Sequence, residues 1–264
     1  MLLTSIKCSN CGTYHDATLR ECPGCHKDNK LRTLKDFPQH VLFLHPIAQL
    51  SIFIIGFAYL GMLISERIFY EFISSLLLIE ILTFSLAAIG ILSIILFTRK
   101  KYFFDNLKRY ENYLVGLLFA LIAIGTGFLL SLLISIWYKG DSNANQIDAE
   151  SLVVVYPIPA FILFCFLGPI CEELTYRVGL YSLLRRFNKY LALVLTTIVF
   201  ALIHYRFNNE DVVSELWSIP SYLVAGFILT YAYEKGGLPS SLTAHVIYNL
   251  VSFVITLVRY GQQA

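Results

Sequence analysis

The chain has few charged residues. Of its 264 residues, 14% are Asp, Glu, Lys or Arg, whereas soluble globular proteins contain about a quarter. An ordinary soluble domain is therefore excluded, and so is a disordered chain, because 57% of the residues are hydrophobic. The formal net charge is only +2, so the chain also lacks the excess of Lys and Arg that nucleic-acid partners require. A polytopic membrane protein in contact with the lipid bilayer remains.

Long uncharged runs predict α-helices, because lipid offers no hydrogen-bond partner to an open strand edge. About seven runs have, or nearly have, the ~20 residues needed to cross a bilayer. They occupy residues 46–64, 72–98, 112–138, 151–171, 190–205, 216–233 and 236–258. The fourth run can continue through residues 172–184. We therefore predict an all-α polytopic membrane protein.

Lys and Arg are concentrated in alternate connections between these runs, at residues 7–35, 99–109 and 177–189. The positive-inside rule assigns such connections to the cytoplasm. The acidic connection 139–150 is then outside, and an odd number of crossings puts the C-terminus outside too. Because residues 1–6 are too short for the apolar core of a secretory signal, we expect a cytoplasmic N-terminus.

The cysteines near the N-terminus form a paired motif. Cys8 with Cys11, and Cys22 with Cys25, each enclose two residues, with turn-forming residues in and beside the pairs. Two such turns present thiolates to a tetrahedral Zn²⁺ ion. A redox dithiol pair is the alternative, but this segment lacks the βαβ context of such motifs. We predict a structural zinc ribbon, in which the metal supplies on the order of 10 kcal/mol of folding free energy.

Polar side chains interrupt the apolar runs of the C-terminal half. Titratable groups cost several kcal/mol in lipid and therefore indicate function. They are Glu172, Glu173, Arg177, His204 and His245, joined by the amide Asn249. Glu172 and His204 stand at similar distances from the connection around residues 186–189, so continuous helices would bring them to the same depth.

This set of groups suits hydrolysis of an amide bond. Glu172 can accept a proton from water, and His204 can orient that water. His245 and Asn249, four residues apart on one helix face, can donate hydrogen bonds to a developing oxyanion.

The same residues form three ordered motifs: Glu-Glu-x-x-x-Arg, Phe-x-x-x-His and His-x-x-x-Asn. In these motifs the chain resembles the CPBP intramembrane peptidases, which include CAAX prenyl endopeptidases and bacterial proteins linked to bacteriocin processing and self-immunity. The motif residues are Glu172, Glu173, Arg177, Phe200, His204, His245 and Asn249. Family members commonly have glycine directly after the motif arginine, whereas this chain has Val178 and then Gly179.

The resemblance implies an intramembrane endopeptidase of the bacterial plasma membrane that acts on a membrane-associated peptide or protein. It implies that Glu172 and His204 activate water, that His245 and Asn249 form an oxyanion hole, and that Glu173 with Arg177 is a supporting pair. No catalytic cofactor is expected.

The predicted organisation is a zinc ribbon at residues 1–30, a linker at 31–45, a variable transmembrane region at 46–138 and the catalytic transmembrane core at 151–260. The ribbon could bind a cytosolic partner, help to recognise substrate or cap the cytosolic face.

Two alternatives remain open at this stage. Glu172, His204 and His245 could hold a catalytic metal, since two His and one carboxylate form a known ligand set, although the sequence has no HExxH pair. Alternatively, the protein could be a non-catalytic immunity or scaffold protein in which the polar groups only pack.

Overall fold

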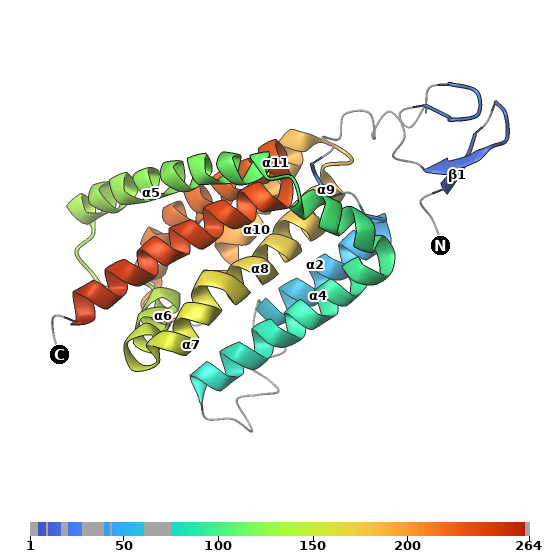
Figure 1. Ribbon diagram of the computed structural model, residues 1–264. Coiled ribbons are helices and arrows are strands. Elements are labelled where there is room, and N and C mark those ends of the chain that lie inside the picture. The colour runs from blue at the N-terminus through green and yellow to red at the C-terminus, as the bar shows by residue number, and fades with distance from the viewer. Residues whose placement is uncertain are drawn as a thin grey trace.

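The computed structural model describes residues 5–8, 10–16, 21–27, 40–42, 44–60, 75–207 and 209–261. A small antiparallel sheet near the N-terminus lies outside a bundle of helices (Figure 1). The predicted all-α membrane fold with an N-terminal ribbon is confirmed. Its elements are β1 (Ser5–Lys7), β2 (Tyr14–Asp16), α2 (Pro46–Leu60), α4 (Leu76–Leu107), α5 (Glu111–Trp137), α6 (Ala144–Val155), α7 (Pro157–Ile162), the π-helix η1 (Leu163–Leu167), α8 (Gly168–Glu172), the π-helix η2 (Glu173–Tyr181), α9 (Ser182–Leu184), α10 (Lys189–Leu202) and α11 (Val212–Gly261).

Within these residues, 4 helices are long and apolar enough to cross a membrane: Leu76–Leu107, Glu111–Trp137, Pro157–Leu184 and Val212–Tyr260. The apolar helices Pro46–Tyr59 and Lys189–Leu202 are shorter. The number of qualifying helices is thus lower than the about seven crossings that run length predicted. Residues 61–64 and 72–74 of the first two predicted runs lie outside the described part of the chain.

The last two predicted runs form one element, α11, that folds back at Gly237. Gly237 has φ 67° and ψ −161°, and a Cβ atom there would collide with the carbonyl of His40. Glu215 and Tyr260 both contact the short helix α6, at Ala144 and Glu150. In a straight helix those residues of α11 would be about 70 Å apart. The contacts therefore require two antiparallel limbs joined at Gly237.

The predicted fourth run begins later than expected. Helix α6 ends at Val155, and a new helical stretch begins at Pro157 and continues to Leu184. Between them Tyr156 has φ −133° and ψ 64°, because proline disfavours the helical conformation of the residue before it. The continuation through residues 172–184 is present.

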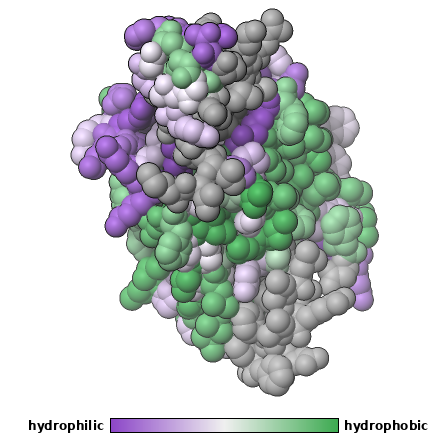
Figure 2. Space-filling view, turned by 90° about the vertical axis from the view of Figure 1, so that its right-hand side faces the viewer, coloured by the Kyte–Doolittle hydropathy of each residue, from purple (hydrophilic) through white to green (hydrophobic). Residues whose placement is uncertain are grey.

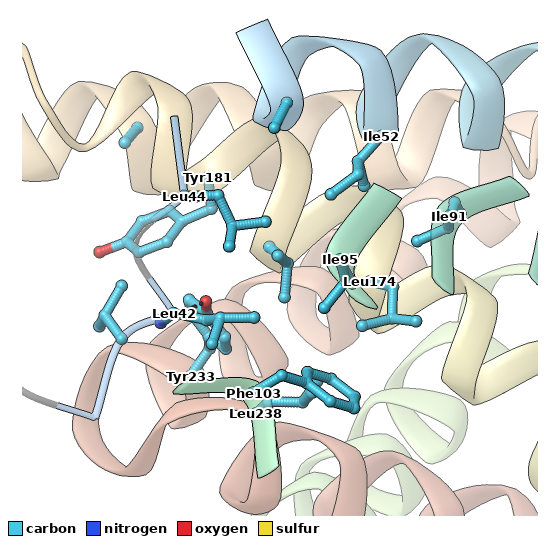
Figure 3. Packing of buried hydrophobic residues seen from close by; sticks show 14 residues of the cluster. Leu42, Leu44, Ile52, Ile91, Ile95, Phe103, Leu174, Tyr181, Tyr233 and Leu238 are labelled. Atoms are coloured by element: carbon cyan, nitrogen blue, oxygen red, sulfur yellow. Dashed lines mark hydrogen bonds between the residues drawn. The ribbon is translucent and has the colours of Figure 1, made fainter. Parts of the chain in front are cut away.

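Residues 40–42 and 44 anchor the chain between helices. Val41, Leu42 and Leu44 are buried in the largest apolar cluster (Figure 3). Tyr102 donates to the carbonyl of Val41 at 3.0 Å, and Arg186 donates to the carbonyl of Leu44. The basic connections around residues 99–109 and 185–189 thus lie at the same end of the bundle as this anchor.

The outer surface of the bundle is broadly apolar. In Figure 2 hydrophobic residues cover much of the visible face, while hydrophilic residues gather toward one end. Phe97 illustrates this surface, because 92% of it is exposed. Extended apolar surface of this kind indicates contact with a partner or membrane, and together with the long apolar helices it identifies an integral membrane protein.

Candidate active site

The three sequence motifs meet around the ring of Phe200 on α10. The ring centroid of His204 lies 4.9 Å from that of Phe200, and the ring of His245 on α11 lies 6.4 Å away. The guanidinium carbon of Arg177 on η2 stands 4.6 Å over the same ring. Residues that are far apart in the sequence therefore share one compact site.

Glu173 connects two of these motifs. Its Oε1 forms an ion pair with Arg177 Nη1 at 3.0 Å and lies 2.9 Å from His245 Nδ1. The side chains of Glu173 and Arg177 are both 0% exposed, so each charge depends on its partner. Both residues belong to the π-helix η2, every residue of which is buried. Short π-helical segments are frequent at functional sites.

Of the two adjacent carboxylates, Glu172 is more accessible than Glu173. Its side chain is 16% exposed, and its Oε2 stands 3.8 Å from His245 Nε2. It is also close enough to His204 for direct electrostatic interaction. A separation of 3.8 Å is longer than a direct hydrogen bond.

His204 follows the end of α10 and is held by its surroundings. Its Nδ1 lies 2.8 Å from the carbonyl oxygen of Phe200. Its ring stacks on Tyr222 of α11, with centroids 4.3 Å apart and an interplanar angle of 21°. Because Nδ1 is engaged, Nε2 is the nitrogen left to face a substrate or water.

Asn249 has a partner that the sequence did not suggest. Its Nδ2 donates to the carbonyl oxygen of Phe164 at 2.8 Å, and Phe164 belongs to the π-helix η1. This bond directs the amide toward η1 and occupies one of its two N–H groups.

The sequence reasoning did not single out the polar groups behind His204. Asn143 donates to the carbonyl of His204 at 3.2 Å, and to buried Glu215 at 3.5 Å. A capping pattern signals Asn143, since Gln146 stands three residues later. Glu215 is the acidic residue of the otherwise uncharged segment 212–217, which was its only signal, and Tyr222 had none.

The four N-terminal cysteines converge as the motif predicts. Their Sγ atoms all lie within 4.8 Å of one another, with 3.7 Å between Cys8 and Cys25 and 3.4 Å between Cys11 and Cys22. Tetrahedral Zn²⁺ with Zn–S bonds of about 2.3 Å places its sulfurs about 3.8 Å apart. The donor set therefore fits a closed zinc site.

The environments of these thiols differ. The Thr13 hydroxyl, 3.2 Å from Sγ, lowers the pKa of Cys11 to about 6. Desolvation raises the pKa of Cys22 to about 11. The site thus contains a thiol that is readily ionised beside one that metal binding must deprotonate.

Comparisons with known proteins agree with the motifs. Residues 154–251 match the family model described as type II CAAX prenyl endopeptidase Rce1-like. A protein of Mycoplasma capricolum, named only "Uncharacterized protein", is 28% identical over 170 residues, which are 60% of this chain and 47% of that protein. The UPF0177 protein YvdC of Lactococcus lactis is 29% identical over 136 residues, which are 50% of this chain and 49% of that protein.

The chain thus spans about half the length of the curated relatives it matches. No solved structure matches it. The family match covers all three motifs, so the resemblance inferred from them is confirmed. It supports a CAAX-type intramembrane protease fold for this part of the chain.

Proposed function

We propose that this membrane protein, whose C-terminal region resembles the type II CAAX prenyl endopeptidases, hydrolyses a peptide bond of a membrane-associated substrate. The observation that carries the proposal is the meeting of Glu172, His204 and His245 from separate helices beside the ring of Phe200. Titratable side chains are costly inside an apolar bundle, and their presence therefore indicates a function.

Glu172 acts as the general base in this proposal. It is the carboxylate that water can reach, whereas Glu173 is fully buried and already bound to Arg177 and His245. Water between Glu172 and His204 loses a proton to the carboxylate as its oxygen attacks the peptide carbonyl. The Nε2 atom of His204 orients that water, since its Nδ1 is engaged by Phe200.

His245 supplies a hydrogen bond to the oxyanion through Nε2. Because Nδ1 faces the carboxylate of Glu173, donation from Nε2 requires both ring nitrogens to carry a proton. Two carboxylates, Glu172 and Glu173, balance the two cations, His245 and Arg177. Arg177 also holds Glu173 in place. Asn249 contributes with the N–H that Phe164 does not occupy.

The test compares matched carboxylate variants. Glu172→Gln and His204→Ala should abolish cleavage, while Glu80→Gln changes a carboxylate of α4 that belongs to no motif and should leave cleavage near the wild-type level. Peptides that accumulate in membranes of Glu172→Gln cells identify candidate substrates, which are then assayed with purified protein in vesicles. Cleavage at wild-type rate by both Glu172→Gln and His204→Ala would disprove the mechanism. If Glu172→Gln restores the phenotype of cells that lack the protein, a scaffold role is favoured instead.

We propose the metal-free form of this chemistry. In the described part of the chain, His, Cys, Asp or Glu side chains that lie close enough together to share an ion are found at the N-terminus. The four N-terminal cysteines form such a group. The test is a chelator added to a variant in which the four ribbon cysteines are serine. Retained cleavage supports a glutamate mechanism, and chelator-sensitive cleavage supports a metal held by Glu172, His204 and His245.

We further propose roles for the N-terminal region. The cysteine cluster would hold structural Zn²⁺ through Cys8, Cys11, Cys22 and Cys25, on the cytoplasmic side of a bacterial plasma membrane. We expect a cytosolic partner for this ribbon, because it precedes the membrane core in the sequence and would lie in the cytoplasm. The domain boundaries are those predicted from the sequence.

A further inference from the structure

We propose that Glu215 is a positioning residue for His204, acting through Asn143 on its main chain and through Tyr222 on its imidazole ring. The inference rests on the proposed function, in which His204 orients water. It concerns groups outside all three motifs.

His204 needs external support because it lies beyond the last turn of α10. Helix α10 ends at Leu202, so the carbonyl of His204 has no helical partner of its own. Asn143 supplies that partner at 3.2 Å. The ring contacts both Phe200 and Tyr222, and Tyr222 stacks on it.

Glu215 is the buried centre of the network behind His204. The residue is 0% exposed. Its Oε1 accepts from Asn209 Nδ2 at 2.7 Å and from Ala144 N at 3.0 Å. Its Oε2 accepts from Arg206 N at 3.1 Å and from Asn143 Nδ2 at 3.5 Å. One carboxylate thus joins the loop after His204, the start of α6 and the first turn of α11.

The start of α6 carries this support to His204. Asn143 caps α6, because its side chain accepts from Gln146 N at 3.3 Å, and the same side chain binds both Glu215 and the His204 carbonyl. Two residues later, Asn145 Nδ2 donates to the hydroxyl of Tyr222 at 3.2 Å. By fixing α6, Glu215 fixes the two groups that determine where the His204 ring lies.

Position 215 requires a carboxylate because all four of its partners are N–H donors, so both side-chain oxygens must accept hydrogen bonds. A buried carboxylate without a cation is unfavourable unless several N–H groups point at it. Glutamine would be nearly isosteric, but its NH₂ group would face two of these donors and lose their hydrogen bonds. Glu215→Gln therefore removes the function of the side chain with little change in its volume.

The experiment measures how well His204 is held, independently of any peptide substrate. Purified protein in vesicles is treated with diethyl pyrocarbonate, and modification of each histidine is followed by mass spectrometry. We expect Glu215→Gln to raise the modification rate of His204 on the order of fivefold, with no change at His45. Asn143→Ala should have the same effect, and it alone decides the question if Glu215→Gln does not fold.

Glu150→Gln is the matched control. Glu150 is also on α6 and accepts hydrogen bonds from Gln146 at 2.9 Å and from Tyr260 at 2.6 Å. In the described part of the chain, its carboxylate makes no hydrogen bond to Asn143, Tyr222 or His204. The rate at His204 should remain at the wild-type value in this variant. An unchanged rate in Glu215→Gln, or an equal increase in Glu150→Gln, would overturn the proposal.

Peptide cleavage separates this inference from the proposed function. Glu215→Gln should lower kcat about tenfold while KM stays within about twofold, because the ring moves and substrate contacts persist. If wild-type protein cleaves no peptide but Glu215→Gln still loosens His204, the proposed function fails and the positioning role stands. If cleavage depends on Glu172 and Glu215→Gln keeps the wild-type kcat, the positioning role fails and the function stands.

Discussion

At the scale of single residues, the buried pair of Glu173 and Arg177 governs the stability of the site. Arg177→Met removes the cation paired with the buried carboxylate of Glu173, which leaves the site with an excess negative charge. We expect a loss of about 3 to 5 kcal/mol in the free energy of unfolding. The double variant with Glu173→Gln should lose less, since it leaves no uncompensated charge. Denaturant titration in micelles measures both.

Arg259 provides the control for this prediction. It is an exposed residue in the last turn of α11, and Arg259→Met should change stability by less than about 0.5 kcal/mol. Equal losses for Arg177→Met and the double variant would contradict the idea that the pair matters through charge compensation.

The ribbon cysteines allow a second prediction at this scale. Cys11→Ser removes one of four converging sulfurs and should lower the zinc content of the purified protein and its resistance to a competing chelator. Cys165→Ser, in the helical bundle, should leave the zinc content unchanged. In the wild type, zinc affinity should fall as the pH is lowered, because protons compete with the metal for the thiolates. Equal zinc content in Cys11→Ser and wild type would refute the ligand assignment.

At the scale of elements, glycines set how closely α2 approaches the motif helix. A Cβ atom on Gly56 would collide with the side chain of Thr175 in η2, and one on Gly179 would lie 2.9 Å from the backbone nitrogen of Phe53. Gly179 thus provides close helix packing, although the chain has Val178 where the family commonly has glycine.

This packing predicts different outcomes for two glycine variants. Gly56→Ala should destabilise the protein by about 2 kcal/mol through overpacking. Gly125→Ala is the control, because a Cβ atom there would meet nothing within 4 Å, and its higher helix propensity should leave stability equal or slightly increased. Thermal unfolding in micelles compares the two, and similar midpoints would contradict the close approach of α2 to η2.

At the scale of the whole molecule, the bundle has a basic end and an opposite end. Gly237 meets His40 at the basic end, and the limb of α11 that follows it extends about 35 Å to Tyr260, longer than the ~30 Å hydrocarbon core. The anchor at residues 40–42 and 44 and the end of α11 therefore lie on opposite sides of the bundle.

The arrangement predicts the outcome of reporter fusions. A fluorescent protein at the N-terminus should fluoresce, and alkaline phosphatase after residue 264 should be active, if basic connections remain in the cytoplasm. Removing Lys100, Lys101, Lys108 and Arg109 should weaken this orientation. Inactive phosphatase at the C-terminus would refute the proposed topology.

The sequence alone determined the features that depend on local composition or short spacing. Apolar runs identify membrane helices because each crossing must satisfy its own backbone hydrogen bonds. The spacing of Cys8, Cys11, Cys22 and Cys25 indicates metal ligands because two tight turns are enough to present them. The three motifs could also be recognised from the sequence, since each spans only a few consecutive residues.

Only the tertiary structure decided which groups the motif residues contact. The sequence did not show that Glu173 binds His245, that Asn249 donates to Phe164, or that Glu215 supports His204 through Asn143. These contacts join residues dozens of positions apart, and they depend on the reversal at Gly237 and on the break before Pro157. Periodicity identifies a helix and its faces, but long-range packing selects the neighbour that each face meets.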